Sequence, residues 1–261
     1  MNKSAFIKRL FGTIMRRIPV GSHLKRELLE VTLLQTEEVA YARLRDQGFC
    51  PGGIIDVGAH QGDWIRLVRQ LFPDPPALSI EAREEQRALL TQICSALPET
   101  QFVIALLGSE SKQNVPFHIH GSGSSMFAER SDALRAIRQM QMRTLDEVVS
   151  SDIRIKSPIF LKLDIQGAEL EVLRGAERTL SLSEVVQLEV AILNYNEGAP
   201  SSADVVAFMD ANGFAIYDIA GFIRPTGADL VQLDILFVKK NSSLRHDFFR
   251  FHPSEEHPKG I

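Results

Sequence analysis

The chain has 261 residues, a formal net charge of -4 and an apolar content of 44%. These values suit one large α/β domain with room for an appendage, and the charge gives no general argument for binding nucleic acid. Two cysteines, Cys50 and Cys94, are too few for a disulfide framework, so we expect a reducing compartment, the cytoplasm. No apolar run of about 20 residues is present to span a membrane, and the N-terminus lacks the apolar stretch of a secretion signal.

Residues 1–26 are basic, contain no acidic residue and repeat apolar side chains at helical spacing. The basic residues are Lys3, Lys8, Arg9, Arg16, Arg17, Lys25 and Arg26. A basic amphipathic helix can lie on an anionic surface such as the inner face of the cell membrane. We favour packing of its apolar face on the main domain or on a second subunit of a homodimer, and keep peripheral membrane contact as the alternative. A second helix is predicted over residues 24–44.

The segment GIIDVGAHQG at residues 53–62 predicts a short buried strand that leads through a glycine loop into a helix. This order of elements opens the nucleotide-binding half of doubly wound α/β domains. The loop has the spacing D-x-G-x-x-x-G from Asp56 to Gly62, which differs from the dinucleotide fingerprint G-x-G-x-x-G. The spacing resembles the first motif of class I S-adenosylmethionine methyltransferases. A glycine turn that binds no ligand is the alternative.

Strands and helices then alternate. A second strand is predicted over residues 77–80, and Glu81 at its end is well placed to accept hydrogen bonds from a ribose diol. A helix over residues 83–97 leads to a third strand over residues 101–107, which ends at the turn of Gly108 and Ser109.

The middle of the chain departs from this alternation. Alternating apolar residues predict an extra strand over residues 114–120, and the small residues at 121–126 form a linker or a substrate loop. A helix is predicted over residues 132–142. His118 and His120 share one face of the extra strand, but two histidines without a third ligand are a weak metal signal, so we predict no metal site.

The second half returns to an α/β pattern with a mixed end. We predict a strand over residues 158–165, a helix from about Ala168, a strand over 185–190, a helix over 203–209, an antiparallel strand pair at 214–217 and 233–238, and a polar tail from Asn241.

Several segments resemble the FkbM-type methyltransferase family. They are LKLDIQGAE at residues 161–169, LRGA at 173–176, TLD at 144–146, GF at 213–214 and DILF at 234–237. Together with the glycine loop they cover roughly residues 51–240 in the right order. The chain departs from the family at His60, where Asn is frequent, and at residues 80–82, where Ile-Glu-Ala replaces Phe-Glu-Pro.

The resemblance implies a Rossmann-like α/β fold whose seven-strand sheet is mostly parallel with an antiparallel closing pair. It implies S-adenosylmethionine as the methyl donor and a hydroxyl of a sugar, glycan or natural-product-like small molecule as the acceptor. We therefore divide the chain into a basic helical extension at residues 1–50, a methyltransferase domain at 51–240 and a polar tail at 241–261.

The cofactor would be held by residues of the glycine loop and of the next two strand ends. Asp56 would bind the donor's amino group directly or through water, and Glu81 would hold the ribose. The full set of expected cofactor residues is Asp56, Gly58, Ala59, Gly62, Glu81, Gly108 and Ser109. Gly108 and Ser109 would lie beside the adenine, although the usual acidic or amide partner is not evident there.

Asp164 is our first candidate for a catalytic or acceptor-orienting group, because it stands at the carboxyl end of a buried strand. Capping of the following helix is its alternative role. His60 is a candidate base, since a neutral imidazole accepts protons near neutral pH, and Glu189 is a candidate acceptor contact. Glu169 is expected to brace the loop, and Lys162 to be solvated.

Two rival functions remain at this stage. A nicotinamide-dependent oxidoreductase shares the fold class, but the glycine spacing argues against it. A cofactor-binding or scaffold protein without catalysis would retain the same acids for structural reasons. Fold class alone does not choose among these functions.

Overall fold

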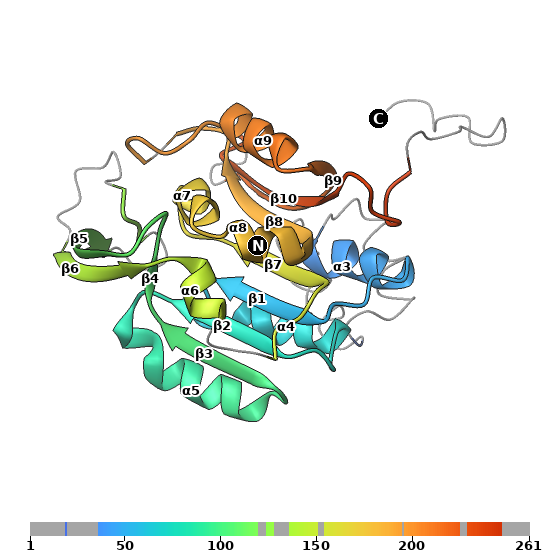
Figure 1. Ribbon diagram of the computed structural model, residues 1–261, viewed down its shortest axis with the longest axis horizontal. Coiled ribbons are helices and arrows are strands. Elements are labelled where there is room, and N and C mark those ends of the chain that lie inside the picture. The colour runs from blue at the N-terminus through green and yellow to red at the C-terminus, as the bar shows by residue number, and fades with distance from the viewer. Residues whose placement is uncertain are drawn as a thin grey trace, which may run out of the picture.

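The computed structural model describes residues 19, 36–119, 124–127, 136–150, 154–194, 196–224 and 229–246. Within these residues the chain forms a seven-stranded sheet of order β3-β2-β1-β7-β8-β10-β9 and a three-stranded sheet of order β4-β6-β5 (Figure 1). The basic helix predicted within residues 1–26 lies outside the described residues, apart from Pro19.

The main sheet confirms the expected Rossmann-like architecture. Its five parallel strands are β1 (Gly53–Val57), β2 (Ala77–Glu81), β3 (Thr100–Ile104), β7 (Ile159–Leu163) and β8 (Ser183–Ala191). The sheet closes with β10 (Gln232–Lys239) and β9 (Phe214–Ile223), and β10 runs antiparallel to both of its neighbours. The carboxyl ends of the five parallel strands therefore share one edge of the sheet, where ligands bind in such folds.

Helices bury both faces of this sheet. On one face, Ile54 and Phe160 pack with α3 and α4, and on the other, Ile55 and Leu161 pack with α6 to α9. The helices are α3 (Glu37–Asp46), α4 (Asp63–Leu71), α5 (Arg87–Ala96), α6 (Leu145–Ser150), α7 (Glu169–Arg174), α8 (Glu177–Leu182) and α9 (Ser202–Ala211), with a short 3-10 turn at Glu84–Gln86. Because neighbouring residues of a strand point to opposite faces, a polar residue in a central strand must find a buried partner on its own face.

The helix α3 joins the core of the domain. It begins where the Thr36 hydroxyl accepts a hydrogen bond from the Val39 backbone N–H, and residues Val39 to Leu44, apart from Arg43, are buried. Tyr41 packs edge-on against Trp64 of α4 and Phe160 of β7. The described part of the second predicted helix thus ends at Asp46. The domain boundaries expected at residues 50 and 240 stay predictions.

The small sheet projects from the main sheet at the left of Figure 1 and contains β4 (Leu106–Leu107), β5 (Lys112–Ile119) and β6 (Ala136–Arg143). The predicted extra strand is confirmed by β5. The predicted helix over residues 132–142 is wrong for its described part, because residues 136–143 pair antiparallel with β5 and bury Met142 against Leu106 and Phe117. Cross-strand packing here outweighs a local preference for helix.

The predicted third strand is divided at Ala105. The Ala105 backbone N–H donates to the Glu81 carbonyl at 2.9 Å, after which Leu106 pairs with Met142 in the small sheet. In the segment after β10, Leu244 is buried in the core. Residues 247–261 lie outside the described residues.

Candidate functional site

Polar residues cross the centre of the sheet in two rows. The first row joins neighbours in register on β2, β1, β7 and β8, namely Ser79, Asp56, Lys162 and Gln187, and all four are buried. Two positions further along the chain lie Glu81 in β2, Gly58 just after β1, Asp164 just after β7 and Glu189 in β8, and three of these four residues are acidic. Side chains repeat on one face every second residue, so the second row continues the first toward the carboxyl edge of the sheet.

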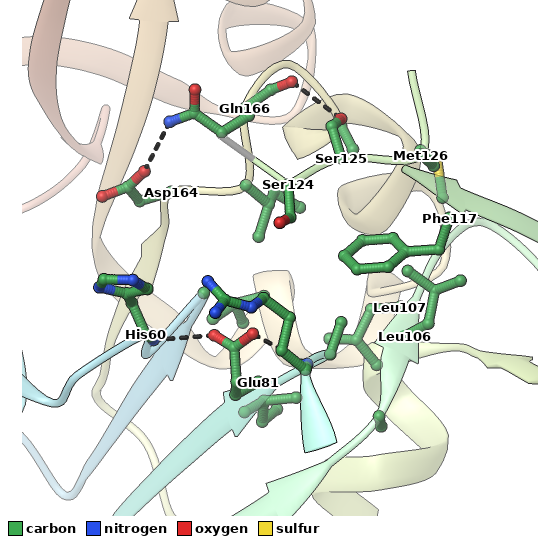
Figure 2. A pocket seen from close by; sticks show the side chains of 18 of the residues that line it. His60, Glu81, Leu106, Leu107, Phe117, Ser124, Ser125, Met126, Asp164 and Gln166 are labelled. Carbon is green, nitrogen blue, oxygen red and sulfur yellow. Dashed lines mark hydrogen bonds between the residues drawn. The ribbon is translucent and has the colours of Figure 1, made fainter. Parts of the chain in front are cut away.

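A cavity of about 280 Å³ lies over the second row. Figure 2 shows Glu81 and His60 along one side, Asp164 and Gln166 opposite them, and Phe117, Leu106 and Leu107 forming an apolar wall. The cavity therefore combines polar groups at two ends with an apolar side, as small-molecule sites do.

Glu81 is held rigidly at the end of β2. One carboxylate oxygen accepts the His60 backbone N–H at 2.8 Å, and the other accepts the Arg83 backbone N–H at 2.9 Å. Each carboxylate oxygen has a second lone pair, which remains to accept a hydroxyl of a ligand. The structure thus places Glu81 in the cavity lining, and its contact with a ribose stays a prediction.

The apolar wall comes from the small sheet and from the segment after β5. Leu106 and Leu107 end the third predicted strand, whereas Phe117 and Met126 reach the cavity from β5 and the segment after it. A flat aromatic group such as adenine suits walls of this kind. Phe117 could not be predicted as a wall residue from the sequence, because the pairing of β5 with β6 decides its position. Met126 ends the segment at residues 121–126, for which the sequence predicts a linker or a substrate loop.

Gly108 and Ser109, the expected adenine contacts, lie outside the cavity lining. Gly108 packs tightly on the side chain of Met142, and its carbonyl lies against Gly175. The turn at Gly108 and Ser109 therefore packs the end of β4 against Met142 and Gly175. From β4 itself, Leu106 and Leu107 line the cavity.

Asp164 lies at the opposite end of the cavity, with its side chain 42% exposed. Burial alone would raise the pKa of this carboxyl, but the Lys162 ammonium at 3.5 Å and hydrogen bonding with Glu189 and Gln166 hold the pKa below its ordinary value. Asp164 is therefore a carboxylate at neutral pH. It is a weak base but a good hydrogen-bond acceptor for a hydroxyl.

Glu189 stands behind Asp164 and does not line the cavity. Only 3% of the residue is exposed, and the Gln166 side-chain amide donates to both of its carboxylate oxygens, at 2.9 and 2.8 Å. Gln166 itself lines the cavity. The third catalytic candidate, His60, also lines the cavity, on the side of Glu81.

The glycine loop contributes one cofactor candidate, Gly58, to the cavity lining. Its φ is +79°, and a Cβ atom there would stand 2.0 Å from the Asp164 carbonyl oxygen, so only glycine allows this approach of the loops after β1 and β7. Asp56, Ala59 and Gly62 do not line the cavity. Their contacts with the cofactor stay predictions.

Asp56 and Lys162 form a buried ion pair beneath the cavity. The Lys162 Nζ lies 3.2 Å from Asp56 Oδ1, and the two side chains are 5% and 0% exposed. The expectation that Lys162 is solvated is wrong, because β7 is covered on both faces and register places the lysine beside the aspartate. Burial raises the pKa of Asp56, and Lys162 opposes that rise.

Glu169 braces the loop between β7 and α7. Its Oε1 accepts the backbone N–H groups of Ile165 at 2.9 Å and Gly167 at 3.2 Å, which fits its expected structural role. Burial raises the pKa of Glu169 from its ordinary value of 4.5 to about 7, although the backbone hydrogen bonds oppose the rise.

Glu169→Gln is expected to stabilise the protein above pH 7 and to have little effect near pH 4.5. Because the folded pKa is raised, the stability that a protonated Glu169 contributes is present below pH 4.5 and is lost as the pH rises through about 7. Glutamine keeps the accepting oxygen without the charge. The gain in unfolding free energy should reach about 3 kcal/mol at pH 8, measured by denaturant unfolding. A gain that does not vary with pH would contradict this role.

Among the described residues, no group of three His, Cys, Asp or Glu side chains is arranged to hold a metal ion. His118 lies in β5, where its backbone pairs with Ser125, and His120 lies outside the described residues.

A family model described as the methyltransferase FkbM domain matches residues 56–216, more than half of the chain. No protein of curated function matches the chain in sequence. Among solved structures, methyltransferase FkbM from Methylobacillus flagellatus KT is 14% identical with a TM-score of 0.45, and the match covers 90% of this chain and 60% of that one. Magnesium protoporphyrin IX methyltransferase from Synechocystis PCC 6803, solved with bound SAM, is 14% identical with a TM-score of 0.44, over 92% and 98% of the two chains. Precorrin-6y C5,15-methyltransferase from Geobacter metallireducens GS-15 is 12% identical with a TM-score of 0.44, over 77% and 88%.

Proposed function

Because the chain belongs to the FkbM methyltransferase family, we propose that it transfers a methyl group to a hydroxyl oxygen of a sugar, glycan or natural-product-like small molecule. Family membership establishes an S-adenosylmethionine-dependent methyltransferase acting on a small-molecule acceptor, and it displaces the nicotinamide alternative. What we propose beyond family membership is that the methyl acceptor is a hydroxyl oxygen. The observation that carries it is the carboxylate of Asp164, which lines the cavity and whose side chain is 42% exposed.

The lining residues fit the cofactor. Glu81 would accept the ribose hydroxyls, and the wall of Leu106, Leu107 and Phe117 would take the adenine. The fit rests on the chemistry of these residues. A carboxylate fixed by two backbone N–H groups suits the ribose diol, and an uncharged apolar wall suits the flat adenine ring. When bound, the cofactor supplies a methyl group on a positively charged sulfur.

Asp164 would orient the acceptor. Its carboxylate would accept the hydrogen bond of the acceptor hydroxyl and hold the oxygen in line for attack, and such positioning contributes about 7–11 kcal/mol in well-aligned reactions. His60 is the second candidate to receive the hydroxyl proton, and Glu189 would act on the acceptor through Gln166. The low pKa of Asp164 makes an orienting role better suited to it than strong general-base catalysis.

The test is a panel of paired acceptors, incubated with S-adenosylmethionine carrying a labelled methyl group. Each pair consists of a sugar or glycoside and its deoxy analogue, which lacks one hydroxyl, together with the corresponding amino sugar. We expect label in the hydroxyl compound and none in the deoxy analogue. Label that enters only amines or carbon centres would overturn the hydroxyl proposal. Binding of S-adenosylhomocysteine without turnover of any acceptor would favour a cofactor-binding protein without catalysis.

No described helix is both long and apolar enough to cross a membrane. Membrane contact through residues 1–26, a homodimer and a cytoplasmic location stay predictions, and deletion of residues 1–26 followed by a liposome association assay tests the first of them.

A further inference from the structure

Lys162 touches oxygen atoms from three places in the site. Its Nζ lies 3.2 Å from Asp56 Oδ1, 3.3 Å from the Gly58 carbonyl oxygen and 3.5 Å from Asp164 Oδ2. An ammonium has three N–H donors, which matches these three acceptors. One buried side chain therefore ties the first polar row, the glycine loop and the cavity together.

We propose that Lys162 is a positioning residue for methyl transfer, which holds the Asp164 carboxylate in place at the acceptor end of the cavity from beneath the sheet edge. The inference rests on the proposed function, since it assigns Asp164 the role argued above. Lys162 itself does not line the cavity, so it acts through Asp164 and through the Gly58 carbonyl.

The hydrogen bonding of the Asp56 carboxylate indicates that Lys162 does more than form a buried ion pair. Asp56 Oδ2 is buried and has no hydrogen-bond partner among the described residues, although a lysine serving Asp56 alone would be free to approach both oxygens. A buried unpartnered oxygen is costly. The ammonium contacts one Asp56 oxygen and also reaches the Gly58 carbonyl and Asp164, so it is shared between the buried pair and the cavity.

The positive charge of the Lys162 ammonium offsets the negative charges of several acidic side chains around it. Burial lowers the pKa of Lys162, but Asp56 and Asp164 outweigh burial and raise it above its ordinary value. The charged and titratable groups that act on Lys162, Asp56 and Asp164 from the packed elements are Glu37 of α3, Glu81 of β2, Cys94 of α5, Glu169 of α7, Glu189 of β8 and Asp234 of β10. Since the acids dominate this set, loss of the ammonium would make Asp164 easier to protonate.

The test compares two variants by carboxyl NMR of aspartate-labelled protein. The double variant Asp56→Asn with Lys162→Gln removes both charges of the buried pair, so the core keeps no unpaired charge. The single variant Asp56→Asn keeps the ammonium and serves as the matched control. The Asp164 signal is assigned by its absence in Asp164→Asn, and thermal unfolding shows that each variant is folded.

We expect the Asp164 titration midpoint to rise by roughly one to three pH units in the double variant and to stay low in the control. The acid limb of the pH profile for methyl transfer should move to higher pH by the same amount, because Asp164 must be ionised to accept the hydroxyl. An unchanged midpoint in the folded double variant would overturn the role of Lys162. A raised midpoint in a protein whose wild type methylates no acceptor would overturn the proposed function instead.

Discussion

Replacement of Asp164 by asparagine is expected to lower the rate of methyl transfer by roughly 10²–10⁴-fold at saturating S-adenosylmethionine. Asparagine keeps the shape of the side chain but removes the charge that polarises the acceptor hydroxyl. The affinity for S-adenosylhomocysteine should change only a few-fold, because the ribose and adenine contacts lie at the other end of the cavity. The measurement is single-turnover methyl transfer to an acceptor identified in the paired panel.

A matched control is Asp210→Asn, which removes an exposed carboxylate at the end of α9, where it pairs with Lys240. Its rate should equal that of the wild type. An Asp164→Asn enzyme with the wild-type rate would remove Asp164 from the mechanism. A large loss of cofactor affinity with an unchanged rate at saturation would show that Asp164 holds the donor rather than the acceptor.

Glu81→Ala is expected to weaken binding of S-adenosylhomocysteine by roughly ten- to 150-fold. Hydrogen bonds to a charged group contribute about 1.5–3 kcal/mol, and Glu81 also fixes the His60 backbone that borders the cavity. Calorimetric titration measures the effect, with thermal unfolding to show that the variant is folded.

Glu81→Gln is a useful companion variant, because it keeps one accepting oxygen for the backbone N–H groups. Its loss of affinity should lie between those of the wild type and Glu81→Ala. Equal affinity in all three proteins would contradict the assignment of the ribose to Glu81.

The sequence located the acids that end the strands, because position along the chain is enough to place them. Glu81 and Asp164 each follow a short apolar run, and in a parallel sheet the carboxyl ends of such runs meet at one edge. The same reasoning predicted the strand, glycine loop and helix from residue 53. These features depend on local pattern alone.

Lys162 could not be interpreted in the same way. A lysine that alternates with apolar neighbours is solvated in a sheet with one open face, and its partner here, Asp56, lies on another strand. Only the order of strands in the sheet reveals that β1 and β7 are neighbours and that both faces are covered. The wrong prediction of a helix where β6 lies and the failure to predict Phe117 as a wall residue have the same cause. Both features are decided by pairing between segments that lie apart in the sequence.

The most direct test of the proposed site is a crystal structure of the protein in complex with S-adenosylhomocysteine. We predict the ribose hydroxyls within hydrogen-bonding distance of the Glu81 carboxylate, the adenine against Leu106, Leu107 and Phe117, and the sulfur facing the end of the cavity at Asp164. A ligand bound elsewhere, or bound in the cavity with its ribose away from Glu81, would contradict the assignment of this cavity as the methyl-donor site.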